Sequence, residues 1–503
     1  MRGKFLSRIE ILVVSALLLF VIAVFCSANL FHYLNYMESD VGGDAVLAKV
    51  IVESGIKVPD TWASSTELRT VSASNLAAVF YLITGNMNLS MGIACSVLLL
   101  CLTLVMICFY AKLGMEPLAV AMAVLVPYVL SGYVHEALEM FALYACYYSP
   151  HIIALFLCGI LYICAKDKEN NKKYLYYGFI LVISFLIGTQ GMRGALMAFI
   201  PIAVVEFAAL MPKMTILTFE RLEGFICAFL SVIAAFIASK ISGAPSVGTT
   251  RNIRNGLNKL FTVVIPQMLD LINAEGYRLP VILILSILAI IGFIKAINKY
   301  KEVFYILFSL GIMLLAGAFT TTETTSRYFV MVLFAIGAGC GIFMNHLLSK
   351  ERTELFSIPV LALVAFISVS SLRNYNNLLL FDMPEDTDEK NVIAFLEDNG
   401  YIHGHATFDY ANMFTALSNG TITVSAIDNY DNLKGTKWLS NAIWYPPYID
   451  ADVQTFYICT DATSDIFKNY LDANKVDTIQ DYYESGKYKV YVLDKDYSYW
   501  SQD

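Results

Sequence analysis

The stretch that decides the fold is IEILVVSALLLFVIAVFCSANLFHYLNYMESDVGGD, residues 9–44. Its first part is apolar over about 22 residues, which is long enough for a helix that spans a membrane. Its last part places the carboxylates of Glu38, Asp40 and Asp44 where such a helix ends, with a Gly-Gly pair at 42–43 that favours a tight turn between the two aspartates. Two questions follow: whether the chain crosses a membrane, and what these carboxylates do at the boundary.

The whole chain has the composition of a polytopic membrane protein. Of its 503 residues, 57% are hydrophobic and 15% are charged, whereas soluble domains carry roughly a quarter charged residues. The mean hydropathy is +0.61. Runs of about 20 apolar residues recur, as expected of spanning helices. Eleven such runs lie near residues 9–30, 90–111, 117–132, 148–165, 174–189, 193–211, 223–240, 279–298, 302–319, 328–347 and 355–372.

The charge of the chain is unevenly distributed. Residues 382–503 hold 21 acidic and 8 basic residues, a net charge of −13, which leaves +5 for the remainder of a chain whose total is −8. The acidic part is also the polar part. The sequence therefore predicts an apolar body followed by a soluble, acidic tail.

The tail has the local signals of a small α/β domain. TITVSAID at 421–428 and YKVYVLD at 488–494 alternate apolar and polar residues as strands do. Thr387 or Asp388 can cap a helix that ends at the Asn-Gly pair at 399–400. The predicted domains are thus a membrane domain over residues 1–372 and a C-terminal domain over residues 373–503.

The connectors between the apolar runs predict the topology. Short basic connectors alternate with longer, less basic ones, and the basic set belongs in the cytoplasm together with the basic N-terminus. An odd number of spans then places residues 373–503 outside the cell membrane, with residues 36–89 as the first external loop. A cleaved signal peptide is the alternative for the first run, but its apolar part is longer than the usual 7 to 15 residues.

The carboxylates of the first external loop have two interpretations. In one, Glu38, Asp40 and Asp44 are ordinary solvated residues at a helix end. In the other, they are catalytic, because a loop of about fifty residues between two spans is long, and long loops are often functional. A second charged pair in the same loop, Glu67 and Arg69, favours the functional interpretation.

Other polar residues are predicted at the same external boundary. His135 and Glu136 lie in SGYVHEALEM, and His151 lies in CYYSPHI beside Tyr147 and Tyr148. The structural alternative is a hydrogen bond at a helix start for His151 and an aromatic belt for the tyrosines.

Besides Arg69, Arg251 and Arg254, two arginines of short external turns are predicted on the outer side, where the positive-inside rule disfavours them. Arg193 lies in GTQGMRGAL and Arg327 in TTTETTSRYF. Glu323 can pair with Arg327 in a purely structural role. A lipid phosphate is the other natural partner, because a guanidinium binds phosphate oxygens in a bidentate manner.

Carboxylates and arginines at the same external membrane boundary suit a reaction between a lipid-phosphate-linked donor and an external acceptor. A carboxylate can act as general base on the acceptor hydroxyl, and cations can stabilise the phosphate that leaves. The chain has no Walker, HExxH or GxSxG motif, so the sequence gives no support for ATP hydrolysis, zinc proteolysis or serine hydrolysis.

With these features the chain resembles the membrane glycosyltransferases of the GT-C fold. Such proteins have a first helix followed by a long external loop that begins with an acidic motif, and many bacterial members end in a small external α/β domain. They use polyprenyl-phosphate sugars as donors. The segments that carry the resemblance are MESDVGGDA, WASSTELRTVS, YYSPHI, GMRGAL, TTSRYF and, in the tail, MFTALSNGTITVSAID.

The resemblance implies a GT-C-like α-helical polytopic protein with about 11 spans and a small C-terminal extracytoplasmic α/β domain. Its activity would be inverting sugar transfer from a polyprenyl-phosphate donor to an extracytoplasmic glycan or protein acceptor, without nucleic acid. The motif Glu38-Ser39-Asp40 fits the ExD type, which makes Asp40 the first candidate for the base, Glu38 the second and Asp44 the third. Arg193 or Arg327 would meet the donor phosphate. The predicted site wall comprises Glu67, Arg69, His135, Glu136 and His151.

Metal use and two rival functions stay open at this stage. The carboxylates can hold a divalent cation, although no set of ligands at metal spacing is evident. A transporter or flippase of a lipid-linked glycan predicts ionisable residues deep inside the spans, of which Glu206 is the clearest. A non-enzymatic membrane protein would use its tail to bind a partner, with Trp438, Trp444, Tyr445 and Tyr448 as the aromatic candidates.

Overall fold

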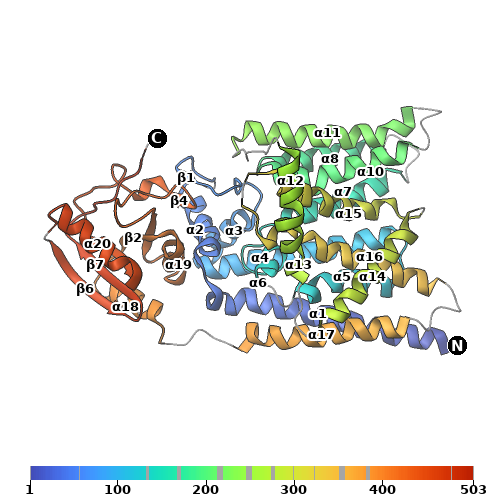
Figure 1. Ribbon diagram of the computed structural model, residues 1–503, viewed down its shortest axis with the longest axis horizontal. Coiled ribbons are helices and arrows are strands. Elements are labelled where there is room, and N and C mark those ends of the chain that lie inside the picture. The colour runs from blue at the N-terminus through green and yellow to red at the C-terminus, as the bar shows by residue number, and fades with distance from the viewer. Residues whose placement is uncertain are drawn as a thin grey trace. The chain divides into compact units, whose positions relative to one another are not determined.

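A computed structural model describes the chain in two compact units (Figure 1). One unit comprises Met1–Cys26 and Ser96–Leu378, and the other comprises Ser27–Cys95 and Leu379–Asp503. The described residues are 2–55, 57–131, 135–166, 172–211, 219–244, 252–272, 278–297, 299–321, 323–349, 357–380, 386–476 and 478–501.

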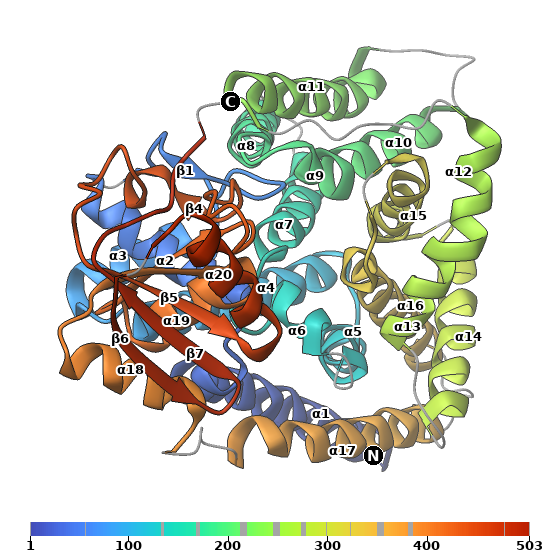
Figure 2. The same ribbon diagram turned by 60° about the vertical axis from the view of Figure 1, so that its left-hand side comes forward.

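The first unit is helical, and each of the eleven apolar runs coincides with a helix (Figure 2). Within the described residues, eight helical stretches are long and apolar enough to cross a membrane. The runs at 117–132 and 355–372 give shorter apolar helical stretches, Pro117–Leu130 and Ser357–Ser371, and the run at 174–189 lies in a helix of 17 residues. The helices are α1 (Arg2–Ser27), α4 (Met87–Lys112), α5 (Pro117–Leu130), α6 (His135–Phe141), α7 (Ser149–Lys166), α8 (Lys172–Gly188), α9 (Met192–Gly194), α10 (Ile200–Leu210), α11 (Phe219–Ile241), α12 (Ile253–Lys259), α13 (Ile265–Ile272), α14 (Arg278–Ala296), α15 (Phe304–Phe319), α16 (Met331–Leu348) and α17 (Ser357–Leu380).

Small residues bring the central helix α16 close to its neighbours. A Cβ atom at Gly339 would lie 2.5 Å from the carbonyl oxygen of Ala289 in α14. On another face, a Cβ atom at Gly341 would lie 2.5 Å from the Cβ atom of Ala123 in α5. Lipid tails are as apolar as leucine side chains, so close packing at small residues is a main source of helix association in a membrane.

The predicted topology leads to a labelling experiment. Ala473 is exposed at the end of a tail helix, α20 (Asp461–Ala473), and Glu116 is exposed before α5 in a basic connector. A cysteine at Ala473 should react with an impermeant thiol reagent in intact cells, whereas a cysteine at Glu116 should react only after permeabilisation. Protection of the Ala473→Cys variant in intact cells would contradict the external placement of the tail.

The tail part of the second unit is built on a five-stranded sheet of order β3-β2-β5-β7-β6. Strand β2 runs parallel to β3 and β5, and β7 runs antiparallel to β5 and β6. The strands are β2 (His403–Thr407), β3 (Thr423–Ile427), β5 (Thr455–Thr460), β6 (Ile479–Ser485) and β7 (Tyr488–Leu493), and the helices are α18 (Asp388–Asp398), α19 (Phe408–Leu417) and α20.

Local predictions for the tail are confirmed. The side chain of Thr387 caps α18 by accepting a hydrogen bond from the backbone N–H of Lys390. The two alternating segments form β3 and β7. The predicted fold class, a polytopic helical protein with a small C-terminal α/β domain, is therefore confirmed.

The segment 36–89, predicted as the first external loop, belongs to the same unit as the tail and packs against it. Its helix α2 (Ser39–Glu53) contacts α19, and its short strand β1 (Trp62–Ala63) pairs with β4 (Ser440–Asn441). A second helix of the segment, α3 (Ala73–Thr84), follows β1. The packing of this loop on the tail was not predicted from the sequence.

Candidate active site

The acidic motif lies at the start of α2. Glu38 occupies the N-cap position and is exposed, while Asp40 lies in the first helical turn and is half-buried. A helix N-terminus stabilises negative charge, so a carboxylate is favourable there. The glycines at 42–43 lie inside the helix rather than in a tight turn. A Cβ atom at Gly42 would lie 2.7 Å from the backbone oxygen of Asn412, so glycine allows α2 to approach α19.

Asp44 is buried in a network of hydrogen bonds and ion pairs. Its Oδ1 atom accepts hydrogen bonds from Nε of Arg69 and from Oγ of Ser74, both at 2.9 Å. Arg69 also lies 3.7 Å from Glu67, measured from Nη1 to Oε2. The side chains of Asp44, Arg69 and Glu67 are only 2%, 7% and 3% exposed. This arrangement ties α2 to the following loop and to the first turn of α3.

The two aspartates of α2 thus differ in environment. Burial raises the pKa of Asp44 above its usual value, although Arg69 and Ser74 act in the opposite direction; the charge of Asp40 adds to the increase. Asp40 and Asp44 are four residues apart and so lie on one face of the helix. The half-buried Asp40 is therefore better placed to meet a substrate, and the buried Asp44 is better placed to hold the helix.

In the membrane unit, Arg193 is held between two aromatic rings. Its guanidinium carbon lies 4.7 Å from the ring centroid of Tyr148 and 5.3 Å from that of Tyr328. Such cation–π contacts are worth about 0.5–2 kcal/mol each, depending on solvation. Arg327 precedes Tyr328 in a short 3-10 segment, Ser326–Phe329, and both arginines are partly exposed. The aromatic contacts orient Arg193 and bring its segment next to that of Arg327.

The remaining predicted wall residues fall into three cases. Glu67 and Arg69 belong to the buried network around Asp44. His151 is fully buried in the first turn of α7, with its ring centroid 6.3 Å from that of Tyr148. His135 and Glu136 begin α6, but their side chains lie outside the described part of the structure.

Two further residues belong to these clusters and were not predicted. Ser74 donates to Asp44, and Tyr328 stacks on Arg193. No local sequence signal identifies either one, since each acts through a residue that is distant in the chain. An aromatic belt was the structural alternative for Tyr148, and the structure shows a specific contact of its ring with Arg193.

Glu206, the clearest ionisable residue for the transporter alternative, is neutralised by neighbours. Lys166 Nζ lies 3.1 Å from its Oε1 atom, and Lys301 Nζ lies 3.1 Å from its Oε2 atom. Lys166 also pairs with Glu302 at 2.9 Å. Lys166 is the last residue of α7, Lys301 and Glu302 lie in the 3-10 segment Lys301–Val303 before α15, and Glu206 lies in the second half of α10. The cluster therefore joins neighbouring segments of the helical unit, an arrangement that suits structural pairing better than a translocation path.

Comparison with known proteins identifies the fold. No protein-family model and no curated protein matches the sequence. Among solved structures, ArnT from Cupriavidus metallidurans in the apo state is similar with a TM-score of 0.57 and 10% identity, over 97% of this chain and 98% of that one. ArnT from the same organism bound to undecaprenyl phosphate has a TM-score of 0.56 and 9% identity, over 95% and 97% of the two chains. The chain therefore has a GT-C-like polytopic membrane fold.

Proposed function

We propose that the protein is a membrane glycosyltransferase that moves a sugar from a polyprenyl-phosphate donor to an acceptor in the cell envelope. The observation that carries the proposal is the likeness in fold, over nearly the whole chain, to a protein whose structure contains undecaprenyl phosphate. The acidic motif at the start of α2 and the aromatic-bound arginine in the membrane unit supply the two kinds of group that such a reaction uses.

Asp40 acts as the general base in this proposal. Its carboxylate takes the proton of the acceptor hydroxyl as the hydroxyl oxygen attacks the anomeric carbon of the donor sugar. The bond between that carbon and the phosphate oxygen breaks, and polyprenyl phosphate leaves with the bonding electron pair. Attack from the face opposite the phosphate inverts the configuration at the anomeric carbon.

Arg193 and Arg327 stabilise the phosphate as its charge develops. A guanidinium suits this role because its planar N–H groups match two phosphate oxygens at once. The rings of Tyr148 and Tyr328 hold Arg193 in place before the donor binds, so little side-chain entropy is lost on binding.

Asp44 and Arg69 have a positioning role in the proposal. Their buried contact fixes α2 relative to the loop that follows it, and this fixes the place of Asp40 one turn earlier. Glu38 remains the second candidate for the base because it is exposed at the N-cap of the same helix.

The phosphate-binding role of Arg193 can be tested by donor binding. Arg193→Ala should weaken binding of a polyprenyl-phosphate sugar by roughly 10- to 100-fold, because a hydrogen bond to a charged group is worth about 1.5–3 kcal/mol. Arg193→Lys should show an intermediate loss, since it keeps the charge without the bidentate geometry. The matched control is Lys112→Ala, which removes an exposed cation at the predicted cytoplasmic end of α4. Equal donor affinity in Arg193→Ala and the wild type would remove Arg193 from the site.

A further inference from the structure

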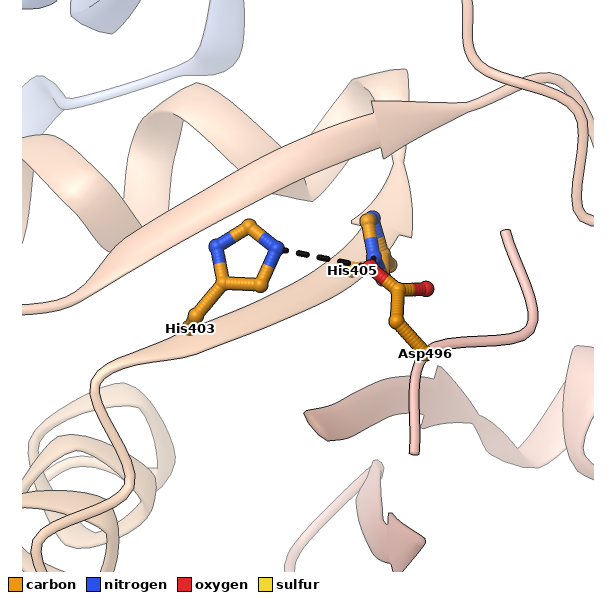
Figure 3. Close-up of side chains that lie close together, drawn as sticks. All are labelled: His403, His405 and Asp496. Carbon is orange, nitrogen blue, oxygen red and sulfur yellow. Dashed lines mark hydrogen bonds and ion pairs between the residues drawn. The ribbon is translucent and has the colours of Figure 1, made fainter. Parts of the chain in front are cut away.

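The tail domain contains a second cluster of functional side chains, far in sequence from the acidic motif. His403 and His405 lie two residues apart on β2, and side chains at this spacing lie on the same face of a strand. Asp496 follows the end of β7 and is 91 residues from His405 in the sequence. Figure 3 shows the rings of the two histidines and the carboxylate of Asp496 close together.

The nitrogen and oxygen atoms of this cluster converge on one point. Nε2 of His405 lies 2.9 Å from Oδ2 of Asp496, and Nε2 of His403 lies 3.6 Å from the same oxygen. The three potential ligand atoms all lie within 4.8 Å of one another. Nε2 of His403 has no hydrogen-bond partner in the described part of the chain, although it is buried.

A second layer of contacts fixes each member of the cluster. Oδ1 of Asp496 accepts hydrogen bonds from Tyr457 Oη at 3.1 Å and from the backbone N–H of Ser498 at 2.8 Å, so Oδ2 is directed at the histidines. The ring of His405 lies 5.3 Å from that of Tyr457, between centroids. The ring of His403 lies 5.2 Å from that of His405, between centroids. Outer contacts of this kind orient the ligands of metal sites.

The charge balance of the cluster also favours a cation. The carboxylate of Asp496 is fully buried, and a buried charge is costly unless it is paired. Within the described residues, the ion-pair partners of Asp496 are the two histidines.

We propose that His403, His405 and Asp496 bind one divalent transition-metal ion of the Zn²⁺ type. Two imidazole nitrogens and one carboxylate oxygen form a common three-residue ligand set for zinc, and the fourth position of such a site is open to water or a ligand. Here the opening adjoins a pocket of about 320 Å³. The pocket is lined by His403 together with Ile402, Thr423, Trp444, Ile449, Asp450 and Val453.

Binding requires a small rearrangement of the ligands. Zinc–nitrogen bonds of about 2.0–2.1 Å place tetrahedral ligand atoms roughly 3.3–3.5 Å apart. Nε2 of His403, now 3.6 Å from Oδ2 of Asp496, therefore moves slightly inward, and Nε2 of His405, now 2.9 Å from the same oxygen, moves slightly away from it. His403 is best able to move because its side chain is 16% exposed beside the pocket, whereas His405 and Asp496 are fully buried. The open fourth position accommodates a water molecule or an oxygen-bearing ligand from the pocket.

The sequence analysis identified no ligand set at metal spacing, and the set proposed in the tail is formed by the fold. A His-x-His pair on a strand was the available signal, but its third ligand is brought in only by the pairing of β7 with β5. The proposed metal site does not depend on sugar transfer, since it uses none of the residues assigned to that reaction.

Metal binding by the full-length protein tests the site. Protein purified in detergent is stripped with a chelator, titrated with ZnSO₄ by calorimetry and analysed for bound zinc after dialysis. The wild type should bind one equivalent. Loss of an outer contact weakens metal binding by roughly 10- to 100-fold. Loss of the proposed ligand in His403→Gln should weaken zinc binding by more than that. His346→Gln, in the last turn of α16, is the matched control and should bind like the wild type.

Two further measurements separate the site from other zinc binding. X-ray absorption of the wild-type complex should show nitrogen and oxygen ligands, whereas sulfur ligands would mean that a free cysteine holds the metal and would overturn the proposal. Circular dichroism should show that His403→Gln keeps its fold. Equal zinc affinity in a folded His403→Gln variant and the wild type, or no zinc bound by the wild type, would also overturn it.

Discussion

Replacing Asp40 by asparagine should reduce sugar transfer by about 10²- to 10⁴-fold, the usual contribution of a general base. The substitution keeps the size and shape of the side chain and removes only its ability to accept a proton. Binding of the donor should therefore be largely retained. Initial rates of transfer and equilibrium donor binding, measured on the same preparation, separate the two effects.

Related substitutions give this experiment its controls. Glu38→Gln should cause a smaller loss of transfer than Asp40→Asn, and Asp44→Asn the smallest loss of the three. Asp60→Asn, at an exposed position of the same loop, should be silent. Wild-type turnover by Asp40→Asn together with inactivity of Glu38→Gln would identify Glu38 as the base. If all three variants of the acidic motif were silent, the site would lie elsewhere.

Replacing Arg69 by methionine should destabilise the second unit by about 3–5 kcal/mol, the usual cost of leaving one partner of a buried ion pair uncompensated. The reason is the burial of Asp44, whose Oδ1 atom lies 2.9 Å from Nε of Arg69 with both side chains nearly inaccessible to solvent. Chemical denaturation in detergent, followed by tryptophan fluorescence, reports the unfolding of this unit because Trp62 and Trp444 lie within it.

Two variants define what the result means. Lys489→Met breaks the pair with Asp461, whose side chain is 64% exposed, and should leave the unfolding midpoint nearly unchanged. Arg69→Met combined with Asp44→Leu and Glu67→Gln removes all three charges of the buried network and should recover much of the lost stability. An unaltered midpoint in Arg69→Met would contradict the anchoring role of Asp44.

The membrane fold could be predicted because its signals are local. A run such as that at 328–347 is recognisable by its length and hydropathy alone, and it forms α16. The helix cap at Thr387 was equally clear from neighbouring residues. By contrast, β1 at Trp62–Ala63 has two residues and pairs with a strand almost 380 positions later, so no local pattern marked it.

The candidate site was predictable in composition but not in geometry. The sequence identified Glu38, Asp40 and Asp44 as a group, because they follow an apolar run. It did not indicate that Asp44 would be buried against Arg69, since that contact depends on the folding of the loop. It also assigned the glycines at 42–43 to a turn, whereas close packing of α2 on Asn412 accounts for them.

The most direct test of the proposed function is to incubate the purified protein with several polyprenyl-phosphate sugars and a cell-envelope acceptor fraction, and to measure the polyprenyl phosphate that is set free. The account predicts release of polyprenyl phosphate in step with labelling of the acceptor by at least one donor sugar, and its loss in Asp40→Asn. Movement of an intact lipid-linked sugar across proteoliposomes, with no polyprenyl phosphate released from any donor, would contradict the account and favour a flippase.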